Sequence, residues 1–348
     1  MTGTPLSATT TAPRPGDPTL TPAAIEPSTT AQATTTPAGK TRVAFVTAGG
    51  AQVEATLAVI QRAAQEFAWE TSWAQDTAPS AVEAAAQSGA AVVVVDGADL
   101  EKQARAIVGN YPDTYFIALH AGEGAPPSNM LALGAPRHDQ AGFIAGLIAG
   151  LATQTKFVAV IGDPRSADGL KHINGFAHGA RYACPKCRIE GIDAASQPPP
   201  ASKAAFIYAA SGCDVFFVAA ATPGEKTLAM TAESLKERGT GWVIGAGGDV
   251  YATVFANGQA PGADRLVTSV YLDEGAALYN ALAAFHDSAP LKGSQPFAAS
   301  TGAIVVTPYN APLEVFSALD RQVVATALGR LADGSLETGI DPATGEEK

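Results

Sequence analysis

The chain has 348 residues, of which 47% are hydrophobic, and its formal net charge is −11 at pH 7. This length exceeds that of one typical domain and predicts two lobes with sizeable cores plus a tail. The acidity is dispersed along the chain, which argues against a nucleic-acid-binding protein because such proteins need clustered positive charge.

The first 40 residues consist mainly of Thr, Pro and Ala, with almost no large apolar side chains. Such a segment buries too little surface to offset the entropy lost on ordering, so residues 1–40 are predicted to form a disordered tether. A misplaced start codon is the alternative explanation. The opening residues lack the basic and apolar regions of a signal peptide, and no apolar stretch reaches the length of a bilayer span. The tether favours an exported protein whose signal is missing from this sequence over a cytoplasmic one.

From Arg42 onward, predicted strands and helices alternate, which is typical of an α/β fold with parallel sheets. The first predicted strands comprise residues 42–47, 69–73, 91–95, 114–119 and 129–133. One helix is predicted to end near Phe67, and two more comprise residues 81–88 and 100–108. The strand at 91–95 is wholly apolar, as expected when both faces of a sheet are covered.

The next predicted helix is unusually rich in small residues. Gly142, Ala145, Gly146, Ala149 and Gly150 recur on its neighbouring faces. Each glycine inside a helix costs about 1 kcal/mol of stability relative to alanine. This accumulation of small residues therefore predicts close packing of the helix against another element.

A connector at residues 153–156 is predicted to cross into a second lobe, where the alternation of strands and helices starts again. The predicted strands of this series comprise residues 157–161, 188–192, 214–219, 242–246, 266–271 and 304–308. Its predicted helices comprise residues 169–182, 202–211, 225–238, 274–285 and 313–331. We expect residues 41–154 and 266–292 in the first lobe, residues 155–265 and 293–340 in the second, and hinges near 153–156, 264–266 and 291–295.

Three short motifs follow one another in the middle of the chain: GFIAG at 142–146, FVAVIGD at 157–163 and GFAHG at 175–179. Their order resembles that of the basic-membrane-protein (BMP) family, the substrate-binding lipoproteins of ABC importers that include purine-nucleoside receptors. In that family a GSFLAG helix leads into a GFVGG strand and then a GFKAG helix. The resemblance covers residues 41–340 and implies a two-lobed type I periplasmic binding protein, with a ligand cleft between two parallel sheets flanked by helices.

Ligands of open α/β sheets bind beyond the carboxyl ends of the strands, so the residues at predicted strand ends are the candidate ligand-binding residues. These candidates are Thr47, Gly49, Gly50, Asp96, His120, Asp163, Thr222, Gly247, Gly248, Asp249 and Tyr251. Glycines there would let the backbone approach a ligand closely, although each alone is also explained as a turn residue.

The other candidates also have simpler explanations. Asp249 and Asp163 are typical helix caps, and for Asp163 capping is the better explanation. Asp96 precedes a glycine as in a common turn. His120 ends a strand and could hydrogen-bond a ligand, but a surface or loop-satisfied histidine is the better explanation. Tyr251 could stack on a ring, and core packing is its simpler explanation.

The chain departs from the nucleoside-binding members of the family at positions that contact the ligand. Where those members carry an acidic residue after the first strand, this chain has Ala48, and their ribose-binding Asp corresponds to Gly247. Their lysine in a TSVVK segment corresponds to Leu272. An unpaired buried hydroxyl costs about 1–3 kcal/mol, so we expect a ligand without a sugar, such as a nucleobase or another small heterocycle.

Cys184 and Cys187 form a CPKC motif, and Cys213 lies apart from it. The motif follows a predicted helix and precedes a strand, which differs from the helix-start position of a redox-active pair. Structural zinc needs about four ligands, more than these three cysteines supply. A disulfide remains, with Cys184–Cys187 as the first choice and Cys187–Cys213 as the alternative.

The sequence contains none of the motifs GxSxG, HExxH, GxGxxG or a P-loop, so we expect binding without catalysis, cofactor or metal. His172 and His178 are six residues apart and do not share a helix face. The resemblance implies a small-molecule ligand, an ABC permease partner, a monomer and an extracytoplasmic, lipid-anchored location. A ligand-sensing receptor module of the same fold is the alternative.

Overall fold

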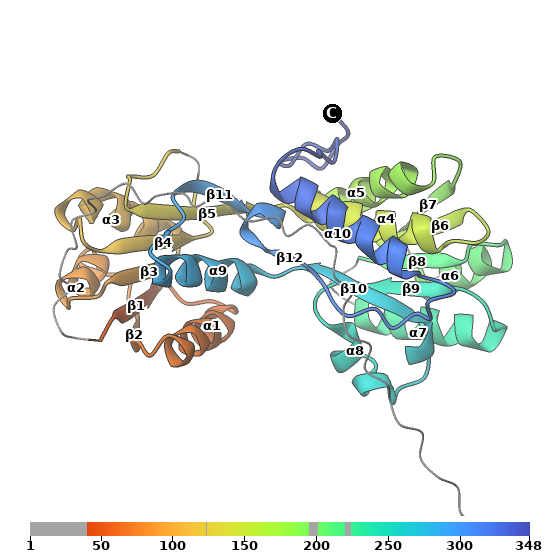
Figure 1. Ribbon diagram of the computed structural model, residues 1–348, viewed down its shortest axis with the longest axis horizontal. Coiled ribbons are helices and arrows are strands. Elements are labelled where there is room, and N and C mark those ends of the chain that lie inside the picture. The colour runs from red at the N-terminus through yellow and green to blue at the C-terminus, as the bar shows by residue number, and fades with distance from the viewer. Residues whose placement is uncertain (1–39, 123, 195–200, 220–223) are drawn as a thin grey trace, which may run out of the picture. The chain divides into compact units, whose positions relative to one another are not determined.

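The computed structural model describes residues 40–122, 124–194, 201–219 and 224–348 (Figure 1). The predicted tether and the candidate Thr222 lie outside these ranges, apart from Lys40. Two six-stranded sheets, each covered by helices on both faces, account for most of the described chain. This arrangement confirms the predicted α/β class.

The first sheet is wholly parallel and has the strand order β11-β5-β4-β3-β1-β2. Its strands are β1 (Arg42–Thr47), β2 (Glu70–Gln75), β3 (Val92–Asp96), β4 (Tyr115–Leu119), β5 (Met130–Pro136) and β11 (Gly293–Phe297). Its helices are α1 (Val53–Glu66), α2 (Ala81–Gln87), α3 (Ala98–Ile107) and α9 (Glu274–His286). Alternate residues of β3 pack against α1 and α9 on one face and against α2 and α3 on the other, which explains why its residues 92–95 are all apolar.

The second sheet has the order β12-β10-β9-β8-β6-β7, and only the β10–β12 pair among these described strands is antiparallel. Its strands are β6 (Phe157–Gly162), β7 (Arg188–Asp193), β8 (Val215–Val218), β9 (Trp242–Gly245), β10 (Leu266–Leu272) and β12 (Ile304–Val306). Helices α4 (His138–Ala152), α5 (Ala167–Ala183) and α10 (Ala318–Ala332) contribute to the core on one face. The other face carries α6 (Ala201–Ala210), α7 (Gly224–Arg238) and α8 (Val250–Thr253). Short 3-10 turns lie at Val108–Asn110, Ala256–Gly258, Ala263–Arg265 and Ala299–Thr301.

The expected lobe boundaries need three corrections. Strand β10 belongs to the second sheet, where it pairs with β9 and β12, and β11 belongs to the first, where it pairs with β5 (Figure 1). Helix α4 packs in the core of the second sheet rather than the first. The chain therefore passes between the sheets after β5, at Asp273 and between β11 and β12, instead of at the expected hinges.

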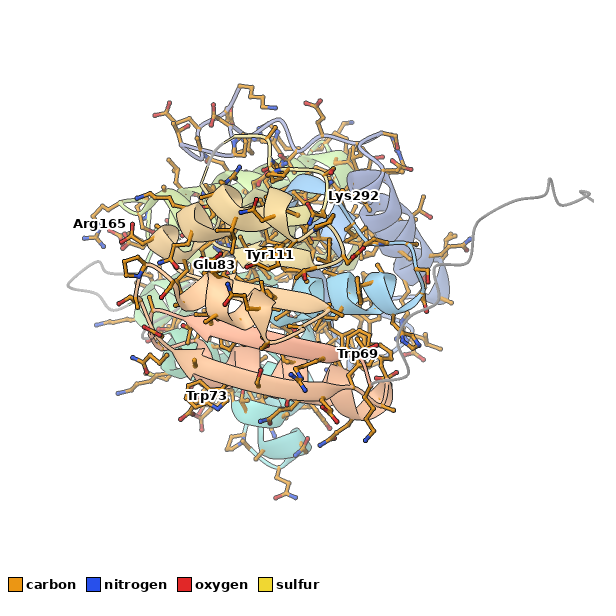
Figure 2. The ribbon with its side chains drawn as sticks, turned by 90° about the vertical axis from the view of Figure 1, so that its left-hand side faces the viewer. Trp69, Trp73, Glu83, Tyr111, Arg165 and Lys292 are labelled. Atoms are coloured by element: carbon orange, nitrogen blue, oxygen red, sulfur yellow. A yellow bond between two sulfur atoms is a disulfide. The ribbon has the colours of Figure 1, made fainter. Side chains whose placement is uncertain are left out.

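The edge strand β2 pairs with β1 alone, and all its residues are exposed. Its Trp73 side chain is 55% exposed and lies at this edge in Figure 2, which views the molecule from the side of the first sheet. Trp69, just before the strand, packs instead against Phe67 and Phe285. The aromatic contacts of Trp69, Phe67 and Phe285 therefore do not include the exposed Trp73 of the edge strand.

The predicted close packing of the small-residue helix is confirmed, and its partner is α5. A Cβ added at Gly142 or Gly146 would lie 2.4 Å from the carbonyl oxygen of His172 or 2.0 Å from that of Phe176. The contact is reciprocal, since a Cβ at Gly179 would lie within 2 Å of the α4 backbone, at 1.9 Å from the Phe143 oxygen. The GFIAG and GFAHG motifs therefore bring two helix backbones into contact, a structural role that ordinary side chains would prevent.

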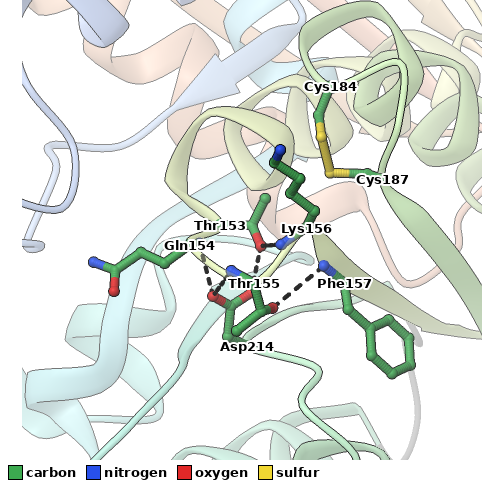
Figure 3. The surroundings of a disulfide bond; sticks show 8 residues. All are labelled: Thr153, Gln154, Thr155, Lys156, Phe157, Cys184, Cys187 and Asp214. Atoms are coloured by element: carbon green, nitrogen blue, oxygen red, sulfur yellow. Dashed lines mark hydrogen bonds between the residues drawn. A yellow bond between two sulfur atoms is a disulfide. The ribbon is translucent and has the colours of Figure 1, made fainter.

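The connector between α4 and β6 is tied to the second sheet by Asp214, which is 7% exposed (Figure 3). The Thr153 hydroxyl donates to its carboxylate at 2.5 Å, and the backbone N–H groups of Gln154 and Thr155 donate at 2.8 and 3.0 Å. A buried carboxylate with three donors holds its partners firmly. The hinge expected at 153–156 is therefore wrong, because this segment is fixed to one lobe.

The cysteines form the first of the two pairings considered. Cys184 and Cys187 are joined by a disulfide in the turn between α5 and β7, as Figure 3 shows. Cys213 is a free, buried thiol, and burial raises its pKa above the ordinary range. The CPKC motif thus closes a local turn of the second lobe.

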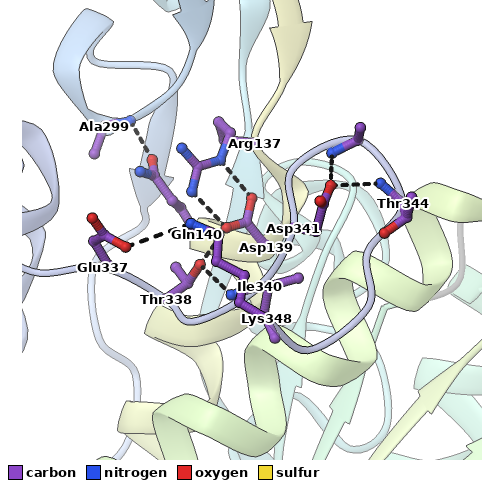
Figure 4. Close-up of polar contacts among 11 residues, drawn as sticks. Arg137, Asp139, Gln140, Ala299, Glu337, Thr338, Ile340, Asp341, Thr344 and Lys348 are labelled. Carbon is purple, nitrogen blue, oxygen red and sulfur yellow. Dashed lines mark hydrogen bonds and ion pairs between the residues drawn. The ribbon is translucent and has the colours of Figure 1, made fainter.

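The C-terminal residues pack over the start of α4, close to the first passage between the sheets (Figure 4). Asp139 is fully buried and accepts two hydrogen bonds from Arg137 at 2.8 and 2.7 Å and one from Thr338 at 2.5 Å. Gln140 accepts a hydrogen bond from the backbone N–H of Ala299, which follows β11. These contacts join three separate parts of the chain at the point where α4 begins.

Candidate functional site

The carboxyl edge of the first sheet begins with the loop after β1. Thr47 is buried, and its hydroxyl accepts a hydrogen bond from the Gly49 N–H at 3.0 Å. Gly49 and Gly50 have φ angles of 96° and 137°, which side chains with a Cβ rarely adopt. This loop therefore needs its glycines for its conformation, whether or not a ligand approaches it.

Two candidates from different strands meet at the same edge. Asp96 ends β3, His120 follows β4, and the Nδ1 atom of His120 lies 3.0 Å from a carboxylate oxygen of Asp96. The other ring nitrogen, Nε2, lies 3.0 Å from a carboxylate oxygen of Glu274, at the start of α9. We call Asp96, His120 and Glu274 the His120 cluster.

The electrostatics of the His120 cluster make the imidazole a cation. The hydrogen bonds to Asp96 and then to Glu274 raise the pKa of His120 to about 10, against the loss of solvent contact, which lowers it. Both ring nitrogens carry protons and donate to carboxylates, so the cluster has one positive and two negative groups. It leaves carboxylate oxygens, rather than N–H groups, available to a ligand.

Glu274 was missed by the sequence prediction, because it lies 154 residues from His120 along the chain. An acidic residue at the start of a predicted helix is adequately explained by the helix dipole. The neighbouring Asp273 is the helix cap, since its carboxylate accepts a hydrogen bond from the Ala276 N–H at 3.0 Å. Only the fold reveals that Glu274 points to a strand end of the first sheet.

The second sheet has a cavity of about 170 Å³. Its described lining is mostly apolar, with two histidines, one glutamate and one tyrosine as the polar side chains. The lining residues are His138, His172, Val218, Ala219, Gly224, Glu225, Leu228, Ala246, Gly247, Val250, Tyr271 and Leu272. A mostly apolar hollow with a few polar groups is typical of small-molecule sites.

The two histidines of this cavity lie side by side, with ring centroids 4.7 Å apart. The Nδ1 atom of His172 is 3.0 Å from the carbonyl oxygen of Asp168, and burial lowers its pKa to about 4. Burial also lowers the pKa of His138. Both rings are therefore neutral at pH 7, in contrast to His120. The sequence prediction missed this pair because its members belong to different helices, α4 and α5.

Part of the glycine-rich turn after β9 lines the cavity. Gly247 and Gly248 have φ angles of 82° and 140°, and Gly247 lines the cavity. Asp249 caps α8, because its carboxylate accepts a hydrogen bond from the Tyr251 N–H at 3.1 Å. Tyr251 packs against the core cluster on the α7 face. Asp249 is thus a helix cap and Tyr251 a core-packing residue, as their simpler explanations stated.

Asp163, the candidate after β6, forms an ion pair with Arg165, with 2.8 Å between a carboxylate oxygen and Nε. Hydrogen bonds from the Arg165 side chain and backbone hold the pKa of this carboxyl below its usual range. The expectation that Asp163 caps α5 is wrong, because the N–H of Gly169 donates to the hydroxyl of Ser166 instead. Arg165 extends to the surface in Figure 2.

Among the described residues, no group of three or more His, Cys, Asp or Glu side chains is placed to hold a metal ion. The helices of this part of the chain are also too short or too polar to cross a bilayer. The polar groups that the fold brings together are thus the His120 cluster on the first sheet and the His138–His172 pair on the second.

Two α/β sheets, linked by three passages of the chain and bearing polar groups near their strand ends, give the chain the fold of a two-lobed type I periplasmic binding protein. The family described as Bmp, "ABC transporter substrate-binding protein PnrA-like", matches residues 56–323. The chain belongs to this family of substrate-binding proteins. No curated protein gives a significant match.

Solved structures share the fold at low sequence identity. An ABC transporter solute-binding protein from Conexibacter woesei is 20% identical, with a TM-score of 0.57 over 85% of this chain and 98% of that one. A transcriptional activator of the comK gene from Bacillus halodurans is 15% identical, with a TM-score of 0.55 over 85% of this chain and 99% of that one. These similarities concern the fold alone.

Proposed function

We propose that the protein is the extracytoplasmic receptor of an ABC importer and binds a small heterocycle, such as a nucleobase or nucleoside, between its two lobes. Family membership supports the transport role. The observation that carries the binding role is the cavity of the second lobe, with the neutral His138–His172 pair in an otherwise largely apolar lining. Aromatic and apolar walls favour a flat, uncharged ring.

Two positions of the cavity favour a ligand without a sugar. Gly247 and Leu272 both line it. By the resemblance to the nucleoside-binding members of the family, they correspond to an aspartate and a lysine. Neither side chain can pair with a ribose hydroxyl. A nucleoside in this cavity would bury hydroxyls without partners, at about 1–3 kcal/mol each, so a nucleobase-like ligand fits the lining better.

The three passages of the chain between the sheets are the proposed hinges: after β5, at Asp273 and between β11 and β12. Closure of the lobes about them would create the surface that a permease recognises. We further propose a monomer that is held at the membrane by a lipid anchor upstream of the described residues. The candidates at the strand ends of both sheets, including Gly49, Asp96 and Gly247, would then contact the ligand in the closed form.

The test is native mass spectrometry of the purified full chain, followed by denaturing extraction of any bound small molecule. Calorimetry with adenine and adenosine then measures the contribution of the sugar. We expect a co-purified heterocycle, and we expect adenosine to bind no more tightly than adenine. Tight binding that depends on the sugar would overturn the sugar-free proposal, and the absence of any bound or stabilising heterocycle would overturn the heterocycle receptor.

A matched pair of variants sharpens this test. Gly247→Asp restores the acidic residue, and a Cβ there meets no atom within 4 Å. Its φ of 82° is one that Asp tolerates better than most residues. Gly334→Asp is the control, since Gly334 also has a positive φ of 77° and open space around it. We expect only Gly247→Asp to increase the affinity for adenosine relative to adenine.

A ligand-sensing module is the second candidate function. The transcriptional activator of the comK gene shares the fold, so the fold by itself does not imply transport. Reconstitution separates the two functions: an importer receptor stimulates the ATPase activity of its permease when the ligand is added. A sensory module would bind the same ligand without this effect.

A further inference from the structure

Among the described side chains that line the cavity of the second lobe, hydrogen-bond acceptors outnumber donors. The Nδ1 atom of His172 faces a carbonyl oxygen at 3.0 Å, and a carbonyl can only accept. This nitrogen therefore carries the ring proton. Because the buried ring is neutral, its Nε2 atom holds a lone pair, so a residue of the cavity lining carries an acceptor.

His138, whose side chain also lines the cavity, holds a second acceptor without a partner. Its Nε2 atom lies 3.7 Å from a carboxylate oxygen of Asp168, which favours the ring proton on this nitrogen. Its Nδ1 atom is buried and has no hydrogen-bond partner among the described residues. A buried polar atom without a partner is costly, so a ligand that donates to it recovers stability.

The remaining polar side chains of the cavity add to the excess of acceptors over donors. Glu225 contributes a carboxylate, which only accepts, and the hydroxyl of Tyr271 both accepts and donates. The described lining includes no Lys or Arg. On the first lobe, both N–H groups of His120 already donate to Asp96 and Glu274, so carboxylate oxygens remain.

We propose that the ligand is a neutral or cationic heterocycle rich in hydrogen-bond donors, with amino rather than carbonyl substituents, and that anions are excluded. This inference rests on the proposed receptor function and narrows its substrate class. The acceptor nitrogens of His138 and His172 and the carboxylate of Glu225 would accept hydrogen bonds from N–H groups and would repel carbonyl oxygens. The same acceptors and the excess of carboxylates disfavour phosphorylated or carboxylated ligands.

The probes are 2,6-diaminopurine and xanthine, which share a ring system and differ in amino and carbonyl groups at the same two positions. Calorimetry of the full chain measures both dissociation constants, with adenosine monophosphate as the anionic probe. We expect diaminopurine to bind at least about tenfold more tightly than xanthine, and the monophosphate not to bind.

Two variants assign this preference to the cavity. Glu225→Gln adds an N–H donor at an exposed position, so it should narrow the preference for diaminopurine. Glu237→Gln on the same helix, exposed and outside the described lining, is its matched control and should change nothing. His172→Phe removes an acceptor while keeping a ring of similar size, and it should also narrow the preference.

The outcomes separate this inference from the receptor function. The proposal of a donor-rich ligand is overturned if xanthine binds as tightly as diaminopurine, or if Glu225→Gln leaves the ratio of their dissociation constants unchanged. The receptor function stands in either case. If neither purine binds, the inference also fails. The receptor function then depends on whether native mass spectrometry finds another small molecule on the protein.

Discussion

The two lobes hold histidines near their binding edges in opposite protonation states. His120 on the first lobe is 43% exposed, lies between two carboxylates and has a pKa raised to about 10. His172 on the second lobe is buried beside a carbonyl and another imidazole, and its pKa is lowered to about 4. The same side chain is a cation in one place and a neutral acceptor in the other because hydrogen-bonded carboxylates and burial act in opposite directions.

The two edges are also built differently. The His120 cluster joins three elements, β3, the loop after β4 and α9, through charged hydrogen bonds. The His138–His172 pair depends on the close contact of the α4 and α5 backbones at glycine. Packing faults should therefore damage the second edge most, and charge changes should tune the first.

The largest effect is expected for Gly142→Ala, because the added methyl would lie 2.4 Å from the carbonyl oxygen of His172. The helices must separate, and we expect a loss of about 3 kcal/mol in the free energy of unfolding, measured by urea denaturation. Gly329→Ala is the control, since this exposed helical glycine of α10 has no atom near the added Cβ. It should stabilise the protein by up to about 1 kcal/mol. Equal stability of the two variants would contradict the backbone contact.

Asp214→Ala tests the other end of α4. The substitution removes the acceptor of the Thr153 hydroxyl and of two backbone N–H groups, which should cost about 2 kcal/mol by urea denaturation. Asp214→Asn keeps one acceptor oxygen and should cost less. If both variants are as stable as the parent chain, the connector is not held by this carboxylate.

The two histidines should give stability opposite dependences on pH. The folded-state pKa of His120, about 10, exceeds the ordinary 6.5, so its contribution is complete below pH 6.5 and is lost as the pH rises towards 10. The folded-state pKa of His172, about 4, is depressed, so only the unfolded chain takes up this proton between pH 6.5 and 4. Its part of the stability therefore falls as the pH falls through that range.

Thermal unfolding between pH 4 and 10 checks this prediction through the midpoint temperature. His120→Gln should flatten the alkaline side of the profile, and His172→Phe should flatten the acid side. A parent profile that both variants leave unchanged would show that neither histidine has the environment described.

The smallest effect concerns the two carboxylates of the His120 cluster. Asp96→Asn and Glu274→Gln should each lower the pKa of His120, and Asp96→Asn should lower it more, because its hydrogen bond is the larger cause of the shift. Histidine resonances followed by NMR through a pH titration measure both shifts. A larger drop in the Glu274 variant would reverse the assigned order.

The sequence by itself determined the features that depend on local pattern. Strand β1 spans the predicted residues 42–47. The apolar residues 92–95 of β3 lie between two layers of helices, because alternate side chains of a central strand face opposite sides. The glycines of GFIAG predicted a close helix contact, because each glycine lowers the stability of a helix and close packing compensates for that loss. The three-residue separation within CPKC matched a disulfide within one turn.

Only the tertiary structure decided which distant segments meet. Strand β11 has the sequence GSQPF, whose Gly and Pro conceal a strand, and β10 is apolar enough to fit either sheet. Glu274 reaches His120 across 154 residues, and His138 meets His172 through the packing of two helices. Local pattern specifies whether a residue is buried and in which element. It does not specify the partner across the fold, because that choice depends on the packing of all the elements together.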